Sequence, residues 1–421
     1  MGNELRHELL CEGIVGVSTE DADNLFAYNR QRLMEKLHGE VVVVAAYASL
    51  QRSNDIAFSF EQEANFWWLS GIEMPNWWLI IDGTRGKSWL VAPAVINRST
   101  QDRERENESI HLLSGVEGVL AQDAGMQMLR ELAKKHSVVR TLGEPPRGDY
   151  LNFSPNPAPK KMYDVLDRIF NAVQDCRREL AQLRAIKHPE EIARIKKAIN
   201  LTMAAFEYVK PKLVEMRHEY EIEAELTYQS RMHGAARPMY DPVVAAGSSA
   251  SDVRYRLNDG KLKKRELVLI DTGARMQGYI AGVTRTYAYG EPTRRQQAVY
   301  ETLRQAQMRI IALLEPHLAV DQYQRDVDSI MRDALASLGL MSTENSIDSY
   351  RRYFPHAISH GVGVDLHDSL GAPHFFQPGM VLTVGPGIYI PEEKIGVRLE
   401  DNILITPTST TNLSARLSTD L

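Results

Sequence analysis

The sequence predicts two domains, an α/β domain over residues 1–180 and an α+β domain over residues 181–421. A chain of 421 residues is too long for one ordinary hydrophobic core. In the first part, strand-like apolar runs alternate with helical segments, whereas the second part begins with long helices and ends in strands. Towards the end of the first part, residues 143–161 carry five prolines, which cannot donate backbone hydrogen bonds and indicate an irregular connection.

Three apolar runs predict strands of the N-terminal domain: VVVVAAYA at 41–48, WWLIID at 77–82 and KSWLVAPAV at 87–95. The β-branched residues of the first run favour a buried strand, and the run is far shorter than the ~20 residues that span a bilayer. Four of the five tryptophans lie within residues 58–82. Such large aromatic side chains form either a core wall or the rim of a subunit interface or substrate cleft.

Helix-start signals divide the rest of the chain. After a helical pattern over residues 162–185, Pro189 suits a first helical position, and the two glutamates that follow suit the positive end of the helix dipole. Thr293, with Gln296 three residues later, predicts a capping box for a further helix. We expect helices over 189–215, 219–234 and about 321–339, and strands near 242–246, 253–257, 266–271 and 279–288.

The composition is that of a soluble globular protein, with 43% hydrophobic and 25% charged residues and a net charge of −6. This mild charge gives no sign of the concentrated basic face that nucleic-acid binding requires, and no apolar run is long enough for a membrane span. The two cysteines, Cys11 and Cys176, cannot form a disulfide framework. Because the charged N-terminal MGNELRHELL also lacks an apolar signal sequence, we expect a cytoplasmic protein.

Two carboxylates stand in strand-like segments where a buried charge needs a partner. Asp271 ends the apolar run at 267–270, and Glu400 lies within VRLEDNILI. Arg398 precedes Glu400 by two residues and therefore shares its strand face. One interpretation is a structural network in which Arg285 and Arg398 neutralise both carboxylates. The other interpretation is a remnant metal or substrate site.

Four histidines lie within nineteen residues, upstream of Glu400: His356, His360, His367 and His374. A lone histidine is usually a structural residue, but several histidines beside glycines and strand-like segments favour a functional site. Imidazole together with carboxylate suits manganese, zinc, iron or cobalt. The histidines therefore strengthen the interpretation of a metal or substrate site.

Several strings in the sequence resemble one family. FPHAISHGVGVDLHD, VLTVGPGIYI and GVRLEDNILIT, with LVLIDTGARMQGYIAGVTRT upstream, are similar to the active-site strands of the aminopeptidase P and prolidase group of pita-bread metallopeptidases. The resemblance covers nearly the whole chain, since FEQEANFWWLSGI and LRAIKHPEEIARIKKA match further parts of the pattern. It implies a creatinase-like N-terminal α/β domain and a C-terminal pita-bread domain, which is a curved antiparallel sheet flanked by helices. It also implies a homodimer or larger homo-oligomer.

The reaction that this resemblance implies is hydrolysis of the bond between an N-terminal residue and proline. Two bridged metal ions generate hydroxide and polarise the carbonyl, and their five ligands follow in the order Asp, Asp, His, Glu, Glu. By resemblance, Asp271, His360 and Glu400 match the first, third and fifth ligands. The resemblance also assigns His356, His367 and Arg398 as catalytic residues. We further expect Arg254 and Tyr389 to bind the substrate.

Three side chains that the resemblance requires are replaced. Gly282 stands in GYIAGVTRT where the family has the second ligand, and Gly385 stands in VGPGIYI where it has the fourth, a glutamate that also acts as base. Arg254 replaces an active-site histidine. Glycine offers no ligand, and arginine stays protonated. We therefore expect weak or absent peptidase activity, one incomplete site for Mn or Zn or no metal at all, and a compensating positive charge from Arg254.

Four functions remain open. The first is a degenerate aminopeptidase P homologue that still binds proline-containing peptides. The second is a metal-free, creatinase-like hydrolase of a small guanidino or amide substrate, with His356 or His367 as base and Arg254 as carboxylate clamp. The third is a non-catalytic peptide-binding or scaffolding protein. The fourth is a one-metal peptidase that uses a water positioned by His367, for which Asp252 or Asp401 is a candidate replacement ligand.

Overall fold

The computed structural model describes residues 19–94, 100–143, 154–235, 240–341 and 347–421. The chain forms two compact units, Met1–Leu183 and Arg184–Leu421, where the sequence led us to expect a boundary at about residue 180. Among the described residues, no helix combines the length and the apolar character that a membrane crossing needs. Each unit has its own sheet and hydrophobic core, and the second unit contains all the predicted site residues.

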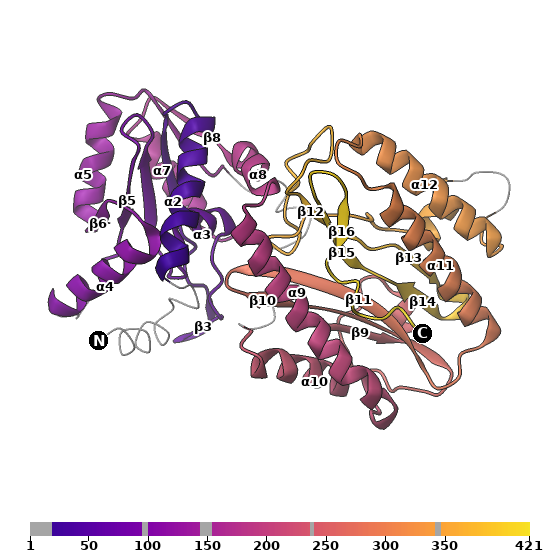
Figure 1. Cartoon of the computed structure of the whole chain (residues 1–421). Helices are drawn as coiled ribbons and strands as arrows, with labels where there is room; N and C mark the ends of the chain where they lie inside the picture. The colour runs from indigo at the N-terminus through magenta and orange to yellow at the C-terminus, as the bar shows by residue number, and fades with distance from the viewer. Residues whose placement is uncertain (1–18, 95–99, 144–153, 236–239, 342–346) are drawn as a thin grey trace. The chain divides into compact units, whose positions relative to one another are not determined.

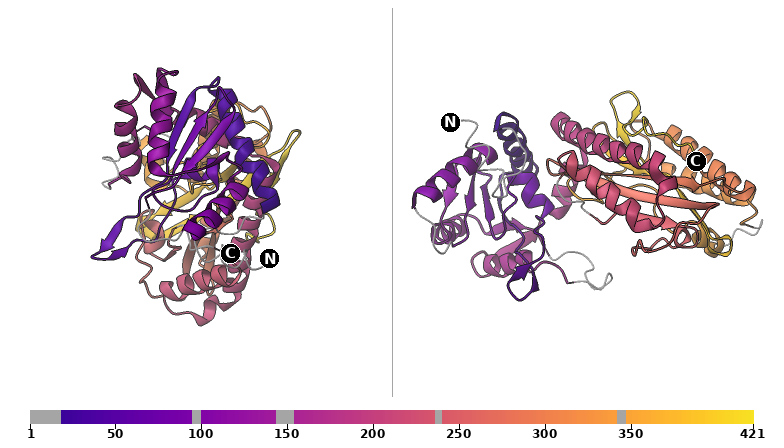
Figure 2. Two further views of the ribbon diagram at one scale, coloured as in Figure 1. Left: turned by 90° about the vertical axis from the view of Figure 1, so that its left-hand side faces the viewer. Right: turned by 90° about the horizontal axis from the view of Figure 1, so that it is seen from below.

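The N-terminal unit is built on a six-stranded sheet in the order β6-β5-β4-β1-β7-β8. β1 runs antiparallel to β4 and parallel to β7, and helices lie on both faces of the sheet (Figure 2). The strands are β1 (Val41–Ala45), β4 (Trp78–Asp82), β5 (Lys87–Val91), β6 (Gly118–Leu120), β7 (Val138–Thr141) and β8 (Ala172–Asp175), with β2 (Gln51–Ser53) and β3 (Ile56–Ala57) in a separate hairpin. The helices are α2 (Thr19–Lys36), α3 (Ala64–Ser70), α4 (Thr100–Ser114), α5 (Gln122–Ala133), α7 (Ala158–Asp167) and α8 (Arg177–Ala185), which runs into the second unit.

The core of this unit accounts for its apolar runs. All five residues of β1 are buried, and Val43 packs there with Leu129 of α5. Three of the four clustered tryptophans are buried as well: Trp67, Trp68 and Trp77. For these three side chains the predicted core wall is confirmed, because burying large aromatic rings contributes strongly to the stability of a small sheet domain.

The helix predicted over residues 162–185 is wrong. α7 ends at Asp167, the strand β8 follows, and α8 begins at Arg177. β8 extends the sheet by pairing in parallel with β7, which sets Val173 opposite Val139. The pairing partner lies far earlier in the chain, so tertiary contact overrides the local helical pattern.

The C-terminal unit consists of strands enclosed by helices (Figure 1). The helices are α9 (Pro189–Val209), α10 (Glu219–Met232), α11 (Arg294–Leu313), α12 (Val320–Ser337) and α13 (Ile347–Tyr353), with short 3-10 turns η1 (Lys210–Glu215), η2 (Ser249–Ser251) and η3 (Pro391–Glu393). The strands are β9 (Val243–Ala246), β10 (Glu266–Met276), β11 (Tyr279–Tyr289), β12 (Val381–Val384), β13 (Gly387–Ile390), β14 (Ile395–Arg398), β15 (Asp401–Ile405) and β16 (Thr410–Asn412).

Both predicted helix starts in this unit are confirmed. α9 begins at Pro189, where the side chains of His188 and Glu191 form a capping box. α11 begins after Thr293, whose hydroxyl accepts from the Gln296 backbone nitrogen at 3.2 Å, while the Gln296 side chain accepts from the Thr293 backbone nitrogen at 2.8 Å. Each cap joins residues three positions apart, so the sequence pattern alone identifies it.

Pairs of antiparallel strands position the residues of the candidate site. β9, β10 and β11 form one ladder, in which Asp271 lies opposite Thr284 and Gly273 lies opposite Gly282. β12, β15 and β16 form a second ladder, and β13 pairs with β14. A bridge between Thr284 and Glu400 joins the first ladder to the later strands. α9 packs against β10 and β11, and α11 packs against β12, β13 and β14.

The strand predicted at 253–257 is also wrong, because this segment is an irregular turn. Glu219 at the start of α10 is fully buried and accepts hydrogen bonds from the Tyr255 hydroxyl and from the Gly260 backbone nitrogen. These hydrogen bonds tie the turn to α10, so residues 253–257 do not pair with a neighbouring strand. Arg254, which was expected beside the carboxylates, lies on this turn.

Candidate active site

The predicted site residues come from strands and strand ends that the ladders bring together. Asp271 lies in the middle of β10, Gly282 on β11 and Tyr389 on β13, and Arg398 ends β14. The other two positions lie in the short links after β12 and β14: Gly385 and Glu400. The ladder registers therefore gather residues that are more than a hundred positions apart in the sequence.

Both carboxylate oxygens of Asp271 are already bonded. Arg398 donates from Nη2 to Oδ2 at 2.6 Å, and the Tyr240 hydroxyl donates to Oδ1 at 2.7 Å. Burial alone would lower the pKa of Arg398, but the neighbouring Tyr389, Asp271 and Glu400 raise it, so the guanidinium keeps its charge. The sequence analysis missed Tyr240. Its only signal is its place within MYDPVVAAGSSA, two residues before Pro242 and the strand β9.

Glu400 has a different environment. Within the described residues, no hydrogen bond or ion pair reaches its carboxylate. Burial and the nearby negative charge of Asp271 raise the pKa of Glu400 to about 8. A Cβ atom at position 385 would lie 2.5 Å from Glu400 Oε2, and one at position 282 would lie 2.9 Å from Tyr240 Oη. The Glu400 carboxylate and the Tyr240 hydroxyl thus take up room that side chains at these two glycines would need.

His356 has both ring nitrogens engaged. Nδ1 lies 2.9 Å from the carbonyl oxygen of Ala357, and Nε2 lies 2.8 Å from the Tyr389 hydroxyl. Because a carbonyl can only accept, Nδ1 carries the proton and Nε2 accepts from Tyr389. Burial lowers the pKa of His356 to about 4. His356 is therefore neutral near pH 7 and has no lone pair left for use as a base.

His360 and His367 lie side by side, with ring centroids 4.5 Å apart in an edge-to-face arrangement. His360 Nδ1 lies 2.8 Å from the carbonyl oxygen of Gly361, which leaves Nε2 for another partner. Burial lowers the pKa of His360. His374, the fourth histidine, is exposed, and its backbone carbonyl accepts from Val320, so it stands apart from this pair.

The predicted role of Arg254 as compensating charge is not what the structure shows. Arg254 is exposed, and in the described part of the chain no hydrogen bond or ion pair joins its guanidinium to Asp271 or Glu400. Arg398 neutralises Asp271 instead. The predicted network is thus correct for Arg398, whereas the second predicted arginine, Arg285, forms its ion pair with a different carboxylate.

That carboxylate is Asp401, which also rules out one predicted replacement ligand. Asp401 Oδ1 accepts from Arg285 at 2.7 Å and from Ser414 at 2.6 Å, and Oδ2 accepts from Gln307 at 3.0 Å. The other candidate, Asp252, is exposed and accepts from the backbone nitrogen of its own turn. Neither carboxylate is therefore available as a ligand for a metal ion beside Asp271.

The side chains that are present do not fit a dimetal centre. Glycine contributes no ligand at positions 282 and 385. Each carboxylate oxygen of Asp271 already accepts a hydrogen bond, and its partner Arg398 is a fixed cation that an incoming metal ion would have to face. Across the described ranges, no group of three or more His, Cys, Asp or Glu side chains is arranged to hold a metal ion. The one-metal set of Asp271, His360 and Glu400 is therefore not assembled either.

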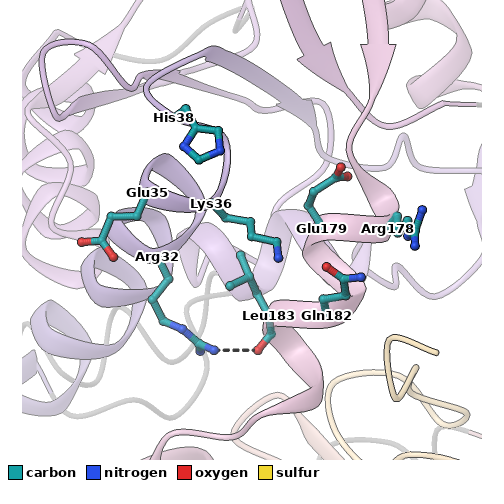
Figure 3. Close-up of a pocket in the computed structure, with 8 residues that line it drawn as sticks. All are labelled: Arg32, Glu35, Lys36, His38, Arg178, Glu179, Gln182 and Leu183. Carbon is teal, nitrogen blue, oxygen red and sulfur yellow. Dashed lines mark hydrogen bonds between the residues drawn. The ribbon is translucent and has the colours of Figure 1, made fainter. Parts of the chain in front are cut away.

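A separate cavity of about 700 Å³ lies in the N-terminal unit (Figure 3). It lies between the C-terminal turn of α2 and α8, and its walls include Arg32, Lys36, Arg178 and Glu179. Arg32 spans the two helices by donating to the carbonyl oxygen of Leu183 at 3.0 Å. All the residues that line it belong to the N-terminal unit. The cavity is therefore separate from the candidate active site around Asp271 and Glu400.

The burial of neutral His356 predicts a loss of stability in acid. Its folded pKa of about 4 lies below the ordinary value of 6.5, so its contribution is complete above pH 6.5 and is lost as pH falls toward 4. In His356→Gln the amide can keep both hydrogen bonds but does not titrate. Between pH 7.5 and 5.0, the wild type should lose about 1–2 kcal/mol of unfolding free energy more than this variant. Equal losses in urea denaturation of the two proteins would contradict this prediction.

Comparison with known proteins agrees with this architecture. Residues 193–407 match the family described as metallopeptidase family M24, and residues 26–136 match the aminopeptidase P N-terminal domain. The Xaa-Pro aminopeptidase of Escherichia coli K12 is 30% identical over 423 residues, which cover 93% of this chain and 94% of that protein. Mouse Xaa-Pro aminopeptidase 3 is 28% identical, over 93% of this chain and 83% of that protein.

Solved structures agree as well. Proline aminopeptidase P II from Yersinia pestis has a TM-score of 0.79 and 26% identity, with 94% of this chain and 97% of that chain covered. Escherichia coli aminopeptidase P with the inhibitor Pro-Leu has a TM-score of 0.78 and 26% identity, with 96% and 97% covered. The predicted fold, a creatinase-like N-terminal domain followed by a pita-bread domain, is confirmed. This chain belongs to metallopeptidase family M24, within the aminopeptidase P group of Xaa-Pro peptidases.

Proposed function

We propose that this protein binds the N-terminal residues of proline-containing peptides and hydrolyses them weakly or not at all. The family relationship supports the class of ligand, because the relatives are Xaa-Pro aminopeptidases and one solved relative holds the inhibitor Pro-Leu. The proposed loss of activity is supported mainly by the two glycines, Gly282 and Gly385, which lie close to Glu400 and contribute no ligand. The nearby Asp271 carboxylate already binds Arg398 and Tyr240.

The remaining groups are poorly suited to activating water. Burial and the negative charge of Asp271 raise the pKa of Glu400, which favours its protonated form when no cation is bound. His356 has no free nitrogen. Loss of a general base alone costs about 10²–10⁴ in rate. His360 Nε2 and the ring of His367 remain available as hydrogen-bonding groups for a peptide.

The proposal includes a cytoplasmic location and a homodimer or larger homo-oligomer. The absence of a cysteine framework supports the location, with only Cys11 and Cys176 in the chain. The family resemblance supports the assembly. Light scattering coupled to gel filtration measures the assembly directly, and a monomer at micromolar concentration would contradict it.

Metal content and turnover together decide the main proposal. The purified protein is loaded with Mn, Zn or Co, and elemental analysis is run beside cleavage assays on Gly-Pro and Arg-Pro-Pro. Calorimetry measures Pro-Leu binding in the same preparations. We expect less than stoichiometric metal, no turnover and saturable binding of Pro-Leu. Stoichiometric metal with turnover would refute the loss of activity, and a lack of Pro-Leu binding would refute the class of ligand.

A metal-free hydrolase is the second candidate, and His367 is the observation in its favour. His367 is exposed, makes no hydrogen bond within the described residues and stacks edge-to-face with His360, so its ring nitrogens are free for proton transfer. Hydrolysis of small amide or guanidino compounds that survives a chelator and disappears in His367→Ala would establish this function. His374→Ala, at another exposed histidine, is the matched control. Turnover that persists in His367→Ala would exclude it.

A further inference from the structure

One irregular segment between α13 and β12 carries both His360 and His367. Gly361 forms isolated bridges to Leu382 of β12 and to Asp368, so the chain folds back on itself between the two histidines. The backbone of His360 is also bonded to Thr383, whose nitrogen donates to the His360 carbonyl oxygen at 2.9 Å. The first histidine is therefore attached to a strand, whereas the position of His367 depends on what holds Asp368.

Asp368 is held by two buried cations, one from the last turn of α8 and one from the link between α8 and α9. Arg184 Nη2 donates to Oδ1 at 2.6 Å, and Lys187 Nζ donates to Oδ2 at 3.4 Å. The side chains of Asp368 and Lys187 are 2% and 1% exposed. Removing one partner of such a buried ion pair leaves an uncompensated charge, so the fold resists any movement that separates them.

Two glycines make room for this arrangement. A Cβ atom at Gly363 would lie 1.7 Å from Asp368 Oδ2, and one at Gly361 would lie 2.5 Å from the Asp368 carbonyl oxygen. Any other residue at either position would push Asp368 out of its place. The glycines in HGVGVDLHD are thus explained by close packing around Asp368, which is the residue directly after His367.

The last turn of α8 and the link that follows it hold the segment around His367 at further points. Arg184 Nη2 also bonds Asp365 Oδ2 at 2.7 Å, so Arg184 binds carboxylates on both sides of His367. The backbone nitrogen of Lys187 donates to the carbonyl oxygen of Gly379 at 3.0 Å, just before β12. None of these groups is a ligand or a base in the mechanism implied by the resemblance.

We infer that Arg184 and Lys187 are positioning residues that, through Asp368, set the place of His367 relative to His360 and thereby the affinity for the proline-containing peptide. This inference rests on the proposed function for the identity of the ligand. The placement of the two histidine rings is a property of the free protein, so that part of the inference is independent of the proposed function.

Lys187→Met tests the inference, with Lys187→Arg as the charge-preserving counterpart. In protein carrying ¹³C-labelled histidine, NMR measures the nuclear Overhauser effects between the rings of His360 and His367, assigned with a His367→Gln variant. In Lys187→Met, Asp368 loses one of its two buried cations and is held less firmly, so these effects should weaken, and Pro-Leu should bind about 10-fold more weakly. Lys187→Arg should restore both values, whereas Arg304→Met, which breaks a solvent-exposed pair on α11, should change neither.

The two readouts separate this inference from the proposed function. If the wild type does not bind Pro-Leu, the proposed function fails, and the distance between the rings of His360 and His367 still decides the positioning role. A folded Lys187→Met variant with the same Overhauser effects between the two rings as the wild type would overturn the inference. If Lys187→Met does not fold, Arg184→Lys replaces it, because lysine keeps the charge but lacks the planar fork that binds two carboxylates. Unchanged Overhauser effects between the two rings in Arg184→Lys would then overturn the inference.

Discussion

Gly282→Asp combined with Gly385→Glu should convert the protein into a metal-dependent peptidase. Both positions adjoin Glu400: the Cβ atoms would lie 3.8 Å from its Oε1 and 2.5 Å from its Oε2, respectively. The new carboxylates would supply the two ligands that are absent, and the second would also supply a base. We expect stoichiometric Mn and a rise in Arg-Pro-Pro cleavage of at least about 10²-fold. Elemental analysis and kcat/KM measure the two effects.

The double substitution must displace side chains that now fill the room. At 385 the obstructing atoms include Glu400 Oε2, and at 282 the nearest is Tyr240 Oη at 2.9 Å, so the obstructions are mainly the ends of side chains. Gly282→Asn with Gly385→Gln has the same size without negative charge and should bind no metal. A folded Asp/Glu variant that also binds no metal would contradict the prediction. It would show that the Arg398–Asp271 pair by itself excludes the ions.

Arg285→Met should be the most destabilising single substitution among those considered. The Arg285 side chain is 1% exposed, pairs with Asp401 at 2.7 Å and donates to the carbonyl oxygens of Glu400 and Leu417. Methionine would leave the Asp401 charge buried with only Ser414 and Gln307 as donors. Removing one partner of a buried ion pair costs about 3–5 kcal/mol, and urea unfolding should show a loss of this size.

A surface ion pair provides the comparison for this substitution. Arg304 and Glu301 pair at 2.8 Å on α11, with side chains 34% and 46% exposed. Arg304→Met should therefore cost no more than about 1 kcal/mol. If Arg285→Met cost as little as Arg304→Met, the prediction that the buried pair stabilises the fold would be wrong.

Much of the fold is readable in the sequence because the signals are local. The capping boxes at Thr293 and His188 join residues three positions apart. The apolar runs that became β1 and β10 are buried along nearly their whole length. The strand β8 and the turn that carries Arg254 were mispredicted because their partners are distant: β8 pairs with β7, and the turn is held by Glu219 of α10.

The sequence also shows glycine at the two positions where the family resemblance implies carboxylate metal ligands, and glycine has no side chain that could bind a metal. Gly282 and Gly385 stand within strings that otherwise follow the family pattern. The sequence therefore shows which chemical groups the site contains and which it lacks. It does not show how the remaining groups pair with one another.

That pairing arises only in the folded chain. Arg398 rather than Arg254 neutralises Asp271, Tyr240 takes the other carboxylate oxygen, and the ring of His356 is bonded on both sides. The contacts of Asp271 with Tyr240 and with Arg398 join residues 31 and 127 positions apart. Such contacts depend on the registers of several ladders at once, and a shift of one residue in a strand would turn its side chains to the opposite face. No local pattern contains that information, so the roles of these residues follow from tertiary structure.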